Sequence, residues 1–120
     1  PFDLTEATAQ GDSQRVMHII QTLRAEGVEP PVLLWALSRD IRLLDGMLGG
    51  GPPPRLPPQR VRAMQNQAQR LNPQQLRIAQ ACAIRADQCV KGMAKGDPWK
   101  HITSLALRLA GHPLPRSMER

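Results

Sequence analysis

The chain has few aromatic residues and no long apolar run. It holds two tryptophans, one phenylalanine and no tyrosine among 120 residues, which leaves little aromatic surface for stacking the bases of a single strand. Its longest uninterrupted apolar run, Val32 to Leu37, is far shorter than the ~20 residues of a membrane-spanning helix. We therefore expect a soluble, cytoplasmic protein with no membrane partner.

Cysteine is also scarce, and the two cysteines do not form a disulfide with each other. Cys82 and Cys89 fall seven residues apart in one predicted helix, which places their Cα atoms about 10 Å apart. A disulfide requires a separation below ~7 Å. We expect both residues to be buried thiols of a cytosolic protein.

Sequence signatures of catalysis and of metal binding are missing. The stretch nearest to a phosphate-binding P-loop, Gly92 to Gly96, lacks the spacing and the final Lys-Ser or Lys-Thr pair. The three histidines, His18, His101 and His112, lie in different segments, with no HExxH helix and no Cys-His spacing typical of zinc. We expect no catalytic, cofactor-binding or metal-binding residues, and so no enzymatic site in this chain.

Positive charge is concentrated in the second half. Residues 1–50 carry four arginines and seven acids, whereas residues 51–120 carry twelve lysines or arginines and three acids. A positive field attracts a polyanion or an acidic partner. The alternative is a solvated, arginine-rich exterior with no specific partner.

The apolar periodicity predicts an all-α protein, a single compact bundle of about six helices over residues 1–120. No segment alternates as a strand would. Because residue 1 is proline rather than methionine, we expect the chain to be a piece of a longer protein. Helix-start signals occur at Asp3, at Asp12 or Ser13, at Pro31, at Asn72-Pro73 and at Asp97-Pro98, and stop signals occur at Gly11, Gly27, Gly92, Gly96 and Gly111.

The last three predicted helices have distinctive apolar stripes. The fourth, about 59–71, has a narrow apolar stripe of Val61, Met64, Ala68 and Leu71 and should lie on the outside. The fifth should bury Leu76, Ile78, Ala79, Cys82, Ala83, Ala86, Cys89, Val90 and Met93, and the sixth Trp99, Ile102, Leu105, Ala106, Leu109 and Ala110. Residues 49–58, a glycine run followed by prolines, predict a flexible internal loop, since neither flank could bury a core alone.

The third helix carries an acid inside its apolar face. Asp40 lies among the leucines and isoleucine that fill about half of the helix circumference. We expect it to be a buried structural acid paired with an arginine from another helix. The other interpretation is a general base with a raised pKa, but no nucleophile or second acid is placed to work with it.

The opposite face of this helix presents Trp35, Arg39 and Arg42. Aromatic residues flanked by arginines are typical of protein interfaces, so we expect an interface between subunits here. Alternatively, Trp35 packs under the N-terminal helices as part of the core.

Three lysines surround the turn between the fifth and sixth helices. Lys91, Lys95 and Lys100 accompany Gly92, Gly96 and Pro98, so mobile ammonium groups lie beside backbone that can approach a phosphate closely. This turn is the candidate DNA-facing segment. The alternative is that the lysines are ordinary helix-end charges that complement the helix dipole.

An ordered set of segments resembles the C-terminal domain of the delta subunit of bacterial DNA polymerase III, which is part of a clamp loader. The set consists of Phe2 to Ala7, Gly11-Asp12, Gly27 to Pro30, Leu37 to Arg42, Asp87, Lys91-Gly92 and Trp99. No single motif is diagnostic, but the order is specific. The loop at 49–58 departs from the family pattern.

The resemblance implies a role in assembly. In this family, the C-terminal helical domain joins those of the gamma or tau and delta-prime subunits in a pentameric collar. AAA+-like modules upstream of it bind the sliding clamp. The chain would then be the oligomerisation module of a loader that places the clamp on primed DNA during replication. It would need no cofactor, lie near primer-template DNA, and reach the clamp only through the upstream part.

The rival function is a stand-alone helical DNA-binding module that uses the basic second half. Helix-turn-helix readers present a recognition helix supported by a partner helix. Here the best basic helix, about 59–71, follows the Gly/Pro-rich loop, and no helix is expected three or four residues before it.

Overall fold

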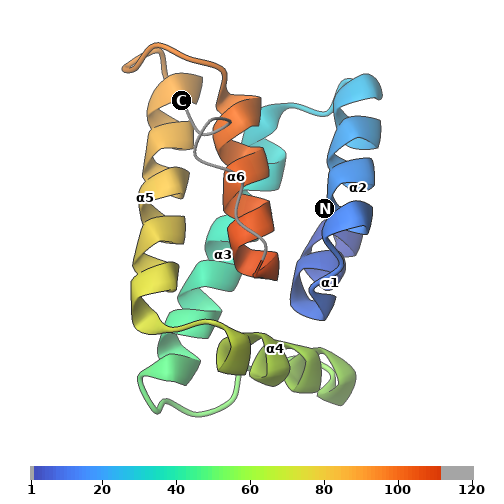
Figure 1. The fold of residues 1–120 in the computed structure, drawn as a ribbon, viewed down its shortest axis with the longest axis vertical. Coiled ribbons are helices and arrows are strands. Elements are labelled where there is room, and N and C mark those ends of the chain that lie inside the picture. The colour runs from blue at the N-terminus through green and yellow to red at the C-terminus, as the bar shows by residue number, and fades with distance from the viewer. Residues whose placement is uncertain (1, 112–120) are drawn as a thin grey trace.

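The computed structural model describes residues 2–111, which form six helices and no strand (Figure 1). The helices are α1 (Phe2–Gln10), α2 (Ser13–Ala25), α3 (Pro30–Leu48), α4 (Pro58–Arg70), α5 (Pro73–Val90) and α6 (Pro98–Ala110). The prediction of an all-α bundle of about six helices is confirmed. None of these helices is long and apolar enough to cross a membrane. His112 lies outside the described residues.

Side-chain caps mark where three of the six helices, α2, α5 and α6, begin. The Asn72 carboxamide accepts a hydrogen bond from the Gln75 backbone N–H at 2.8 Å, and the Gln75 side chain accepts from the Asn72 N–H at 3.0 Å. Asp12 and Asp97 cap α2 and α6 through one bond each, in which a carboxylate oxygen accepts from the backbone N–H of Arg15 and of Trp99, respectively. These bonds satisfy backbone donors that have no partner within the helix. The predicted starts of α2, α5 and α6 are therefore confirmed.

The predicted cap at Asp3 is wrong. Helix α1 already begins at Phe2, so Asp3 lies in its first turn. A carboxylate there still complements the positive end of the helix dipole. At the other end, Gly11 follows the helix at a φ of +74°, a left-handed conformation that glycine adopts at little cost.

Helix α6 forms the centre of the bundle and packs against α1, α2, α3 and α5. Its side chains Ile102, Leu105 and Leu109 are fully buried. Helix α5 runs antiparallel beside it (Figure 1). The predicted stripe of α6 is confirmed, with Trp99 only partly buried at the helix start.

Helix α4 lies across one end of the bundle, against α1 and α3 (Figure 1). Met64, Ala68 and Leu71 of its narrow stripe are buried as predicted. Gln67 is also fully buried, which the stripe did not predict. Its Nε2 donates to the Leu109 carbonyl oxygen at 3.0 Å. That carbonyl lies in the last turn of α6, where carbonyls lack intrahelical partners.

Six of the nine residues that were expected on the buried side of the fifth helix are exposed or only partly buried, namely Ile78, Cys82, Ala83, Cys89, Val90 and Met93. Ile78 is 38% exposed and Met93 is 74% exposed, while Cys82 and Cys89 are free thiols of intermediate burial. Helix α5 ends at Val90, so Met93 has left the helical stripe. Ile78 and Cys82 line the groove between α5 and α6. The two thiols, which were expected to be buried, are therefore only partly buried.

Arg70 connects α4 to α1 by donating hydrogen bonds to carbonyl oxygens in the last turn of α1. Its Nη2 donates to the Ala9 oxygen at 2.9 Å and to the Thr8 oxygen at 3.4 Å. We predict that Arg70→Gln lowers the free energy of unfolding by about 1–2 kcal/mol, since charge-assisted hydrogen bonds are lost. Arg62→Gln, on the exposed side of the same helix, should stay within about 0.5 kcal/mol of the unsubstituted chain. Urea denaturation measures both values, and equal destabilisation by the two substitutions would contradict the assignment.

Candidate functional site

The outward face of α3, defined here as Trp35, Arg39 and Arg42, is exposed as expected for a contact surface. Trp35 is 70% exposed, and Arg39 and Arg42 are also exposed. The alternative in which Trp35 is a core residue is therefore excluded. The three side chains follow one another at spacings of four and three residues, so they share one stripe of the helix.

The exposed tryptophan is unusual in this chain. Among the described residues, the large exposed apolar side chains are Val32, Trp35, Ile78, Ile84 and Met93, and Trp35 is the one aromatic in that set. Val32 lies one turn before Trp35 on α3 and extends the apolar part of the face. Tryptophan and arginine are the residues most enriched at the energetic centres of protein interfaces.

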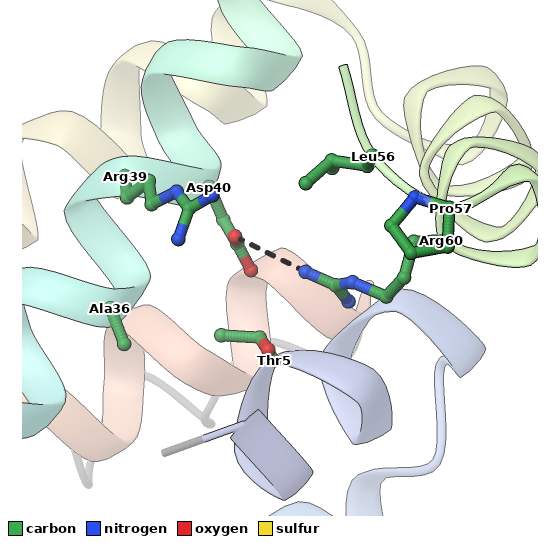
Figure 2. A pocket seen from close by; sticks show the side chains of 7 residues that line it. All are labelled: Thr5, Ala36, Arg39, Asp40, Leu56, Pro57 and Arg60. Carbon is green, nitrogen blue, oxygen red and sulfur yellow. Dashed lines mark ion pairs between the residues drawn. The ribbon is translucent and has the colours of Figure 1, made fainter. Parts of the chain in front are cut away.

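A pocket of about 230 Å³ opens beside this face, between α1, α3, α4 and the end of the loop that precedes α4 (Figure 2). Figure 2 shows the Asp40 carboxylate and the Arg60 guanidinium pointing toward each other from α3 and α4. The lining residues are Thr5, Ala36, Arg39, Asp40, Leu56, Pro57 and Arg60.

Asp40 and Arg60 form a loose ion pair away from solvent. Asp40 is 3% exposed, and its Oδ1 lies 3.9 Å from the Arg60 Nη2. Arg60, expected on the polar side of α4, is largely buried. The partner of the acid is thus an arginine of another helix.

Burial outweighs the ion pair in setting the acidity of Asp40. Loss of hydration raises the pKa of this carboxyl from 3.8 to about 6, and Arg60 and then Arg39 pull it only partly back. At 3.9 Å the Coulomb attraction returns less than the desolvation costs. Asp40 therefore has both the arginine partner and the raised pKa that the two interpretations of the sequence expected.

No group of three or more His, Cys, Asp or Glu side chains that could hold a metal ion occurs among residues 2–111.

The three lysines of the candidate DNA-facing turn lie in different surroundings. The Lys91 Nζ lies 2.8 Å from an Asp87 carboxylate oxygen, one turn back in α5. Lys95 is exposed in the turn itself. Lys100, in the first turn of α6, is partly buried and lines the groove between α5 and α6. The three lysines are close in sequence, but they therefore do not form one uniform cluster of exposed charges.

Comparison with known proteins indicates the class of this helical domain. Residues 1–48 match the family described as the processivity clamp loader gamma complex of DNA polymerase III, C-terminal part. The chain is 32% identical, over 123 aligned positions, to DNA polymerase III subunit delta of Escherichia coli (strain K12). That alignment covers 95% of this chain and 36% of the relative. The chain thus spans about a third of the length of the curated relative that it matches.

The all-helical fold and the two matches support a C-terminal domain of the clamp-loader class. Within that class, the matches support a C-terminal domain of the DNA polymerase III delta type.

The raised pKa of Asp40 predicts an inverted pH dependence of stability. Between pH 3.8 and about 6 the folded chain holds a proton that the unfolded chain releases, so stability falls as pH rises through this window. The loss, on the order of 3 kcal/mol from a shift of about two pH units, should be absent in Asp40→Asn. Urea denaturation of both proteins from about pH 3.5 to 7 measures the difference. Parallel stability curves would show that Asp40 does not titrate in this range.

Proposed function

We propose that this chain is the collar module of a delta-type protein of the clamp loader. It joins the C-terminal domains of gamma or tau and delta-prime subunits in a cytoplasmic hetero-pentamer that loads the sliding clamp on primed DNA. The observation that carries the proposal is the exposed Trp35 flanked by Arg39 and Arg42 on a helix whose other side is buried. The similarity to DNA polymerase III subunit delta supports it.

The outward face of α3 suits assembly because the opposite side of the helix is packed in the core. Leu33, Leu37 and Leu44, on the inner side of the same helix, have no exposed surface. Helix α3 therefore presents Trp35 without reorganising, which lowers the entropic cost of binding. Removing a tryptophan from water contributes apolar burial, and the arginines add hydrogen bonds at its edge.

A substitution series tests the assembly surface. Trp35→Ala should weaken binding to gamma or tau and delta-prime subunits by about 2 kcal/mol or more, the usual loss at an interface hot spot. The pair Arg39→Ala and Arg42→Ala should weaken it as well. The control pair Arg62→Ala and Arg77→Ala removes the same charge from exposed positions on α4 and α5 and should bind normally. Isothermal titration calorimetry measures affinity, and urea denaturation checks folding.

Two results would contradict the assembly surface. One is unchanged affinity in Trp35→Ala and in the arginine pair, when both variants are folded. The other is equal weakening by the control pair, which would indicate a general charge effect.

We propose further that the turn between α5 and α6 faces primer-template DNA in the assembled loader. Gly92 and Gly96 have positive φ angles there, so the backbone can approach a phosphate closely. Lys95 is exposed in this turn. No described carboxylate lies within ion-pair distance of it.

Salt dependence tests this contact. Replacing Lys91, Lys95 and Lys100 by glutamine in the assembled loader should lower primer-template affinity. It should also flatten the slope of log affinity against log salt by up to about three, if each lysine meets a phosphate. The control triple, Arg55, Arg62 and Arg77 to glutamine, removes the same charge elsewhere. An unchanged slope in the lysine triple, with intact assembly, would place the turn away from DNA.

The stand-alone DNA-binding function receives less support. Residues 49–57 separate α3 from α4, so α4 lacks the closely preceding partner helix of a helix-turn-helix. Strong binding of the isolated chain to duplex DNA at ~150 mM salt, without affinity for other clamp-loader proteins, would favour that function instead.

A further inference from the structure

A pocket of about 280 Å³ lies in the groove between α5 and α6, and no residue of α3 lines it. The two helices are antiparallel neighbours (Figure 1), and the Cys82 Sγ and Ser104 Oγ face each other at 3.9 Å. One turn further along, the same register brings Arg85 of α5 beside His101 of α6. The residues that define the pocket chemically are Cys82, Arg85, Lys100, His101, Ser104 and Arg108.

Small side chains at the facing positions create the hollow. Cys82 and Ser104 meet where longer side chains would close the groove. Ser104 is 5% exposed, so its hydroxyl lies on the floor. The pocket therefore combines a polar floor with longer side chains around its rim.

Those longer side chains are mostly cationic. Arg85, Lys100 and Arg108 line the pocket, and no acid does so among residues 2–111. No described carboxylate lies within ion-pair distance of Arg85 or Lys100. The protein thus holds like charges together around one cavity, an arrangement that an anion would stabilise.

The pKa of His101 is affected by the same excess of positive charge. Burial lowers the pKa of its imidazole, and Arg85 and Lys100 lower it further. Asp97, the cap of α6, acts in the opposite direction with the smallest effect.

We propose that this pocket binds a phosphate group. The Arg85 guanidinium offers planar, paired donors that match two phosphate oxygens, and Lys100 adds a compact charge. The Ser104 hydroxyl can donate from the floor. The phosphate belongs either to a nucleic acid backbone or to a small free anion, and the two sources share this chemistry.

Proton NMR of the imidazole groups tests the site on this 120-residue chain. His101 is identified by the signal that disappears in His101→Gln, and exposed His18 on α2 serves as the internal reference. Inorganic phosphate is added at about pH 7 with sodium chloride adjusted to constant ionic strength. We expect a saturable shift of the His101 signal and little change at His18. The pKa of His101 should rise when the anion binds beside it.

Matched charge variants separate the pocket from the general positive field. Arg85→Gln with Lys100→Gln should weaken phosphate binding at least about tenfold, because charge-assisted hydrogen bonds are lost. The control pair, Arg62→Gln with Arg77→Gln, removes the same charge from exposed arginines of α4 and α5. It should change the affinity less than about twofold, as expected for solvent-screened charges. Thermal unfolding verifies that both pairs are folded, and the single variant Arg85→Gln replaces the pocket pair if that pair is not.

A short single-stranded oligonucleotide, added in a second titration, identifies the source of the phosphate. A saturable shift at His101 assigns the pocket to the nucleic acid backbone, and a response to inorganic phosphate alone assigns it to a small free anion. Either result supports the site. Equal, non-saturating shifts of His18 and His101, or equal losses in the two variant pairs, would overturn it.

Discussion

Burial of α6 is the constraint on which the arrangement of the other helices depends. Ile102, Leu105 and Leu109 are fully buried, and α1, α2, α3 and α5 all pack around this helix. Apolar area removed from water is the main favourable term in folding. Because the inner side of α3 packs in this core, Trp35 on the opposite side of the helix faces outward. The same packing that stabilises the domain therefore also exposes the surface that we propose for subunit contact.

Polar interactions attach α4 to the end of this apolar bundle. Gln67 reaches a carbonyl of α6, Arg70 reaches carbonyls of α1, and Arg60 reaches Asp40 of α3. Each one meets a helix-end group or a buried charge that would otherwise be desolvated at a cost. The pocket in Figure 2 lies where α4 and the loop before it meet α1 and α3. There the carboxylate of Asp40 is shielded from water but only loosely paired.

Much of the fold could be predicted because its signals are local. Caps such as Asn72 and Asp97 act within one helical turn, so the sequence alone locates the helices they begin. The apolar stripe of α3 likewise predicted the enclosure of Asp40. Its partner, Arg60, could not be chosen among many arginines, because the choice depends on how α4 crosses the bundle. The cationic pocket was also missed, since it exists only in the antiparallel register of α5 and α6.

We propose that the outward face of α3 becomes buried when the clamp loader assembles. Trp99→Phe leaves Trp35 as the single tryptophan, and Trp35 is 70% exposed in the free chain. Its fluorescence emission can be recorded while gamma or tau and delta-prime subunits are added, with complex formation followed in parallel by sedimentation. Transfer of the indole from water to an apolar contact predicts a shift to shorter wavelength that saturates with the complex. A complex that forms fully while the emission of Trp35 stays unchanged would contradict the claim.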